Sequence, residues 1–274
     1  MVAHNRAAWD REVDGGGNEW TVPVGPDVIA AARAGRWSVV LIGHDPVPPD
    51  WFPARLGGLD VLCLASGGGQ QGPVLAAAGA NVTVFDNSAR QLAQDELVAA
   101  RDGLQLATVL GDMRDLTAFA DASFDLVFHP VSNLFCPDIA PVWREAFRVL
   151  RPGGRLLAGF MNPDVFIFDA GASVHHGELR VRHALPYRDS TDLEPGEHER
   201  LWGPGRPLEH SHTLTAQLGG QLAAGFVIAG FREQPHHDDL TAAYMPGYFA
   251  TLAIRPAGPA GPAGPAGPAG PAGG

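Results

Sequence analysis

Short apolar runs alternate with segments of helical length from Leu59 to Phe160. The run LDVLCLA at 59–65 ends in glycines, and NVTVFD at 81–86 is rich in β-branched residues. Strands that alternate with helices form a parallel sheet covered by helices on both faces. We therefore predict a doubly wound α/β core, with strands at 59–65, 81–86, 104–112, 124–130 and 153–161 and helices at 73–80, 88–102 and 139–150.

The alternation stops after Asn162. Residues 163–212 are rich in histidine, proline and charge, with strand character at 178–183, and they predict a cap over the carboxyl edge of the sheet. A helix at 213–224 and two closing strands, at 226–233 and 247–255, are expected to complete the core.

Residues 1–57 hold four of the six tryptophans among glycines, prolines and charges, with short helical patches at 6–13 and 28–34. Aromatic side chains in such a leader pack on a neighbouring core or form a lid over a ligand. The Ala-Gly-Pro repeat near the C-terminus predicts a disordered polyproline II extension. The expected division is a lid (1–57), a cofactor-binding core (58–162), a substrate cap (163–212), a terminal helix with closing strands (213–255) and a tail (256–274).

Composition excludes several kinds of chemistry. All 19 basic residues are arginine, which rules out a pyridoxal Schiff base, a Walker A loop and a lysine nucleophile. The net charge of -11 argues against a nucleic-acid surface. Two cysteines in apolar surroundings predict reduced, buried thiols. The absence of a signal peptide and of a long apolar run predicts a cytoplasmic protein with no membrane partner.

A glycine-rich turn, LASGGGQQG, follows the first predicted strand. Gly67, Gly69 and Gly72 match the pattern G-x-G-x-x-G, and Asp86 ends the next strand, where a carboxylate can accept from both hydroxyls of a ribose. NAD enzymes and S-adenosylmethionine enzymes share this arrangement. The glycine pattern alone is weak, because such turns also allow close packing of helix and strand.

Three later motifs, in order, distinguish these alternatives. VLGDM places Asp112 after the third strand, SFDLVFHPVSN spans the fourth, and REAFRVLRPGGRLLAGF supplies a helix, a tight turn and the fifth. Together they resemble the class I S-adenosylmethionine-dependent methyltransferases. The resemblance implies a Rossmann-like sheet, mostly parallel with an antiparallel closing strand, and S-adenosylmethionine as cofactor. The cofactor-binding residues that it implies are Ala65, Gly67, Gly69, Gln70, Asp86, Asn87, Gly111, Asp112, Met113 and His129.

Two positions depart from the pattern of that family. Cys63 stands where the family usually has an acidic residue, and Ala65 stands where it has its first glycine. An NAD(P)-dependent oxidoreductase would explain the glycines and Asp86 but not the later motifs. A non-catalytic protein that binds S-adenosylmethionine is the third interpretation, and it rests on these two departures.

His129 ends the fourth strand at the edge where open α/β sheets bind ligands. We predict it as a catalytic base, with His212 as the second candidate. The alternative is that His129 only hydrogen-bonds a backbone carbonyl or lines the cofactor. The histidine groups at 175–176, 210–212 and 236–237 lack a recognised ligand spacing, so no metal is predicted. The predicted substrate pocket comprises Trp9, Asn133, Tyr187, His212 and Tyr244. The expected function is methyl transfer to the oxygen, nitrogen or carbon of a small molecule; no oligomeric state is predicted.

Overall fold

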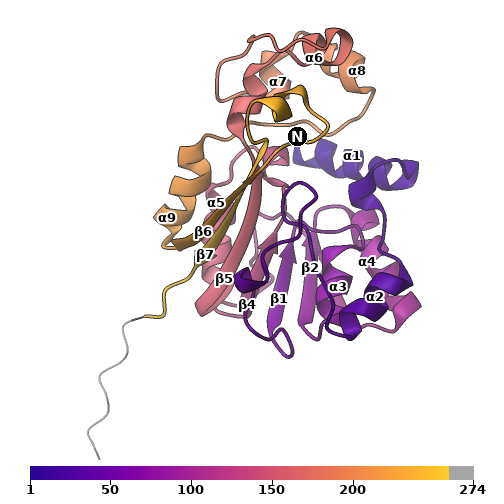
Figure 1. The fold of residues 1–274 in the computed structure, drawn as a ribbon, viewed down its shortest axis with the longest axis vertical. Coiled ribbons are helices and arrows are strands. Elements are labelled where there is room, and N and C mark those ends of the chain that lie inside the picture. Colours follow the sequence, from indigo (N-terminus) through magenta and orange to yellow (C-terminus); the bar gives the residue numbers. More distant parts are fainter. Residues whose placement is uncertain (259–274) are drawn as a thin grey trace, which may run out of the picture.

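The structure, a computed structural model, describes residues 1–258 and contains one seven-stranded sheet (Figure 1). The strand order is β3-β2-β1-β4-β5-β7-β6. Strands β1 to β5 pair in parallel, and β7 runs antiparallel to both β5 and β6. This arrangement confirms the predicted mostly parallel Rossmann-like sheet with an antiparallel closing strand. The strands are β1 (Asp60–Leu64), β2 (Asn81–Asp86), β3 (Leu106–Leu110), β4 (Phe124–His129), β5 (Leu150–Met161), β6 (Val227–Gln234) and β7 (Tyr248–Ile254).

Helices cover both faces of the sheet, as expected from strands such as β1 that are buried on both sides. One apolar core contains side chains of α2 (Pro26–Arg33), α3 (Gln71–Ala77) and α4 (Ala89–Asp102). The other lies under α5 (Ala140–Val149). The helix expected at 213–224 is a π-helical turn, η5 (Thr215–Gly219), followed by α9 (Gly220–Ala224).

Two boundaries have clear local causes. The Ser88 hydroxyl accepts from the Gln91 N–H and begins α4, while Gly103, at φ 63°, ends it in the left-handed conformation. The Pro-Gly-Gly turn expected before the fifth strand lies within β5, where the register against β4 shifts between Phe124 and Leu126. The bulge therefore lengthens β5 by three residues at its start, relative to the predicted 153–161.

Residues 2–15 of the predicted lid and the helices of the predicted cap lie at one end of the sheet, whereas α2, which is also within residues 1–57, packs beside α3 (Figure 1). The lid contains α1 (Val2–Gly15) and the short helices η1 (Glu19–Thr21) and η2 (Pro49–Trp51). A strand was expected at 178–183, but within residues 1–258 the only pairing of this segment is an isolated antiparallel bridge between Phe168 and Val181. The remaining short elements are η3 (Asn133–Phe135), η4 (Pro163–Ile167), α6 (Ala170–His176), α7 (Asp189–Asp192), α8 (Glu197–Trp202) and η6 (Leu240–Ala243).

The five-part division stays a prediction. The tail predicted to be disordered lies, from residue 259 onward, outside the described residues. Among residues 1–258, no helix has the length and apolar character needed to cross a membrane.

Candidate active site

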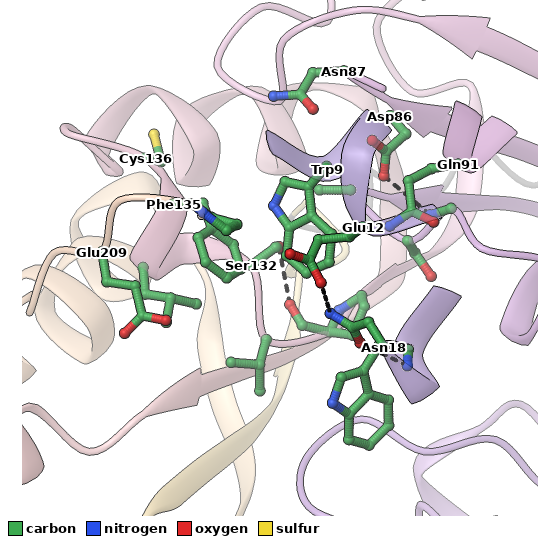
Figure 2. Close-up of a pocket in the computed structure, with 18 of the residues that line it drawn as sticks. Trp9, Glu12, Asn18, Asp86, Asn87, Gln91, Ser132, Phe135, Cys136 and Glu209 are labelled. Atoms are coloured by element: carbon green, nitrogen blue, oxygen red, sulfur yellow. Dashed lines mark hydrogen bonds between the residues drawn. The ribbon is translucent and has the colours of Figure 1, made fainter. Parts of the chain in front are cut away.

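The strand order reverses at β1, which pairs with β2 on one side and β4 on the other. In open α/β sheets, ligands bind at the carboxyl ends of strands beside such a reversal. A cavity of about 860 Å³ lies at this edge, with walls from the core, the lid and the cap. Figure 2 shows part of the wall, with Trp9 and Phe135 between Asp86 on one side and Glu209 on the other.

The predicted site residues fall into two groups. Those on the cavity wall are Trp9, Ala65, Gly67, Gln70, Asp86, Asn87, Gly111, Asp112 and Met113. Those outside the wall are Gly69, His129, Asn133, Tyr187, His212 and Tyr244. The first group follows the ends of β1, β2 and β3, with Trp9 added by the lid.

The glycine-rich turn brings backbone close to the cavity. Ala65 adopts φ 48° and its N–H donates to Phe85 O at 2.7 Å, so an alanine takes the left-handed conformation that glycine usually provides. A Cβ on Gly67 would lie 2.6 Å from Gln91 Cβ. Gly69, at φ 75°, faces α4, and its Cβ would meet Gln94 O at 2.8 Å. Part of the turn therefore lines the cavity, and part of it packs against α4.

Asp86 ends β2 with its carboxylate at the cavity wall (Figure 2). Oδ2 accepts from the Gly67 N–H at 3.1 Å and Oδ1 from the Ser88 N–H at 2.9 Å. Burial raises the pKa of Asp86, and these backbone hydrogen bonds oppose the rise. A carboxylate accepts about four hydrogen bonds, so capacity remains for the two hydroxyls of a ribose. The ribose contact of Asp86 stays a prediction.

The residues after β3 contribute Gly111, Asp112 and Met113 to the cavity wall. A Cβ on Gly111 would lie 2.2 Å from the Phe85 ring, so glycine is required at this position. The Asp112 carboxylate accepts from Arg114 Nε at 3.0 Å and from Nη2 at 2.6 Å. Burial favours the neutral form, but the Arg114 hydrogen bonds and charge outweigh it and lower the pKa of Asp112. An ionised carboxylate beside Met113 suits an adenine with its amino group.

A buried acid on α4, Asp95, was missed by the sequence reasoning. Its Oδ2 accepts from the Gly68 N–H at 3.0 Å, and Oδ1 has no partner among residues 1–258. Burial raises the pKa of Asp95 to about 8. Leu92, Asp95 and Val98 share the buried side of α4 at helical spacing. The sequence signal that could have identified Asp95 is therefore an acidic residue within the apolar stripe of a helix.

His129 lies behind the cavity wall and is fully buried. Nδ1 lies 2.9 Å from Leu64 O, and Nε2 lies 2.9 Å from Asn133 Oδ1. Burial lowers the pKa of His129, opposed by these two hydrogen bonds. The ring therefore joins the end of β4 to the last residue of β1, just before the glycine-rich turn. Asn133 Nδ2 in turn donates to Gln217 Oε1 on η5 at 2.9 Å.

The other predicted acceptor residues have local partners. The His212 Nε2 atom lies 2.8 Å from Cys136 O and 3.0 Å from Asn133 O. The Tyr187 hydroxyl donates to Asp189 Oδ1 at 2.7 Å, and Tyr244 is 80% exposed. No group of three histidine, cysteine, aspartate or glutamate side chains within residues 1–258 is arranged to hold a metal ion.

The lid and the cap are joined directly. The Asn5 amide donates to Phe135 O at 3.0 Å and to Leu208 O at 2.9 Å, and its oxygen accepts from the Leu208 N–H at 2.9 Å. Glu12 pairs with Arg206. On the core side, the Ser88 hydroxyl donates to Asp10 Oδ1 at 2.6 Å. Helix α1 therefore bridges the cofactor end of the cavity and the cap.

The strand order, the glycine-rich turn and the carboxylates after β2 and β3 define a Rossmann-like enzyme that binds a nucleoside cofactor. The sequence profile of a family described as "Methyltransferase domain" matches residues 62–158. Over 255 residues the chain is 49% identical to "Uncharacterized methyltransferase YbaJ" of Bacillus subtilis, covering 93% of this chain and 98% of that protein. The chain belongs to the class I S-adenosylmethionine-dependent methyltransferases.

Solved structures of low identity share the fold. An S-adenosylmethionine-dependent methyltransferase from Mesorhizobium loti has 21% identity and a TM-score of 0.58, covering 75% of this chain and 94% of that one. The 1,6-didemethyltoxoflavin-N1-methyltransferase of Burkholderia thailandensis, solved with 1,6-didemethyltoxoflavin and S-adenosylhomocysteine, has 15% identity and a TM-score of 0.56. It matches 93% of this chain and 88% of its own. These two structures show the shared fold. The assignment of the chain as an S-adenosylmethionine-dependent methyltransferase rests on the sequence profile and the 49% identical relative.

Proposed function

We propose that this methyltransferase transfers the methyl group of S-adenosylmethionine to a small molecule that is enclosed between the lid and the cap. The observation that carries this proposal is the cavity, whose wall includes Trp9 of the lid, Asp86 of the core and Glu209 of the cap. Binding both reactants in one chamber supplies much of the catalysis by proximity and orientation.

The contacts over the cavity favour a small acceptor. Asn5 is 1% exposed and its side chain hydrogen-bonds both to the η3 segment and to the cap. The Glu12–Arg206 pair adds a second link between lid and cap. A macromolecular acceptor would have to separate these segments to reach the cofactor. A small molecule requires only a transient opening.

The net charge of the chain also favours a small-molecule acceptor over a nucleic acid. Its net charge is -11, whereas nucleic-acid surfaces are usually basic. At the cavity, Arg114 is paired with Asp112 and Arg206 with Glu12. Neither arginine is therefore free to neutralise a phosphate. A third arginine on the wall, Arg11, donates to Gly205 O at 2.6 Å and has no carboxylate partner within residues 1–258, so the argument against RNA or DNA rests on the net charge.

A labelled-methyl experiment tests the proposal. The purified chain and methyl-labelled S-adenosylmethionine are incubated with a cell extract separated into small molecules, proteins and nucleic acids. We expect label in the small-molecule fraction and none when Asp86→Ala replaces the parent chain. Label confined to the protein or nucleic-acid fraction would show that the acceptor is a macromolecule.

A further inference from the structure

The cap contributes Glu209 to the cavity wall through a short antiparallel bridge. The Asp189 N–H donates to Glu209 O at 3.1 Å, and the Glu209 N–H donates to Asp189 Oδ2 at 2.7 Å. On the same bridge, the Ser211 N–H donates to Tyr187 O at 2.9 Å. Both the N–H and the carbonyl oxygen of Glu209 are therefore hydrogen-bonded, which fixes the position of its backbone.

The two carboxylates of this bridge differ in their partners. Asp189 accepts from the Tyr187 hydroxyl at 2.7 Å and lies 3.4 Å from His198 Nε2. Among residues 1–258, no hydrogen bond or ion pair reaches the Glu209 carboxylate, because the nearby Arg206 pairs with Glu12. Glu209 is thus the carboxylate of the bridge that remains available to a ligand in the cavity.

Glu209 lies at the end of the cavity opposite the cofactor residues. In Figure 2, Trp9 and Phe135 separate it from Asp86 and Gln91. Their rings meet edge to face, with 5.0 Å between centroids. Because Asp86 is predicted to bind the ribose of the cofactor, an acceptor that approaches from the other end meets Glu209.

We propose that Glu209 binds an O–H or N–H group of the acceptor and thereby selects acceptors that carry such a group. The proposal rests on the small-molecule function proposed above and narrows it to acceptors with a protic oxygen or nitrogen.

The electrostatics of the cap suit this role. Burial, followed by the negative charge of Asp189, raises the pKa of Glu209 to about 8, while Arg206 opposes the rise. The ionised form of Glu209, which accepts hydrogen bonds most strongly, therefore predominates only above about pH 8.

Probe binding tests the proposal without turnover. Ligand-observed NMR on the chain saturated with S-adenosylhomocysteine compares phenol with anisole and benzimidazole with 1-methylbenzimidazole. Above about pH 8, where the Glu209 carboxyl is ionised, we expect the wild-type chain to bind the protic member of each pair at least ~10-fold more tightly, since hydrogen bonds to charged groups are the stronger ones. Glu209→Gln should lose roughly 10-fold in affinity for phenol and benzimidazole and retain its affinity for S-adenosylhomocysteine.

Glu19→Gln is the matched control, because Glu19 belongs to the same cavity wall but its side chain is 62% exposed. It should bind all four probes as the wild type does. Equal affinity for protic and methylated probes, no binding of either protic probe, or unchanged binding in Glu209→Gln would each overturn the proposal. These outcomes are independent of the labelled-methyl experiment, in which a macromolecular product would contradict the small-molecule function itself.

Discussion

The Asp95 carboxylate of α4 accepts a hydrogen bond from the backbone N–H of Gly68, with 3.0 Å between Oδ2 and N. The acid is fully buried beneath the cofactor turn, and burial raises the pKa of Asp95 to about 8. Cys63 stands where the family usually has an acid; burial raises the pKa of its thiol, and the charge of nearby Asp95 adds to the rise. A carboxylate under the turn is thus supplied by a helix rather than by β1.

This burial predicts a pH-dependent stability. The pKa of Asp95 is higher in the folded chain than the ordinary 3.8, so the folded state holds a proton that the unfolded state releases. The resulting stabilisation is complete below about pH 4 and is lost as the pH rises towards about 8. We expect Asp95→Asn to gain stability relative to the wild type over this range, by on the order of 1–3 kcal/mol. Urea unfolding at several pH values measures the difference, and parallel curves for the two chains would contradict it.

The ribose contact predicted for Asp86 is tested by its effect on cofactor binding. Asp86→Ala removes a charged acceptor of hydrogen bonds, and we expect S-adenosylhomocysteine binding to weaken by about 1.5–3 kcal/mol. Asp86 also accepts from the Gly67 N–H, so Asp86→Asn serves as a milder variant that preserves side-chain size. Calorimetry with S-adenosylhomocysteine and NAD provides the measurement. Unchanged affinity in Asp86→Ala would remove Asp86 from the cofactor site.

The buried ring of His129 predicts that its substitution affects the fold and the cofactor together. His129→Asn removes contacts to Leu64 O and Asn133, and we expect it to destabilise the fold by about 1–3 kcal/mol. S-adenosylhomocysteine affinity should fall as well, because β1 leads into the cofactor turn. If the variant instead kept its Tm and cofactor affinity and lost about 100-fold in turnover, His129 would be a catalytic base, as the sequence suggested.

The lid–cap contact predicts a kinetic effect. Asn5→Ala removes three hydrogen bonds to η3 and the cap. We expect the equilibrium between the closed and open positions of α1 to shift towards the open one by about 1–3 kcal/mol. We expect faster amide exchange in α1 and faster release of S-adenosylhomocysteine. Asn81→Ala, which removes exposed contacts to Gly58 and Asp60, is the control. Equal exchange in both variants would mean that Asn5 does not hold the lid.

Local patterns were sufficient for the core. Apolar strands and helical segments alternate over a few residues at a time, so their type and order follow from the sequence. The carboxylates that end strands, Asp86 and Asp112, were found in the same way, because the carboxyl ends of parallel strands meet at one edge. Exact boundaries were less accessible, as the bulge in β5 and the π-helical turn at 215–219 illustrate.

The sequence by itself thus determined the fold class, the cofactor family and the acids at the strand ends. The tertiary structure decided which side chains reach the cavity. His129 ends a strand that leads to the site, but the pleat turns its ring towards Asn133 and away from the cavity wall. Asn5 meets Leu208, and Glu209 meets Asp189, only through packing between segments distant in the chain. Such contacts have no local signature, because their energy depends on the folded neighbour rather than on the residues beside them in sequence.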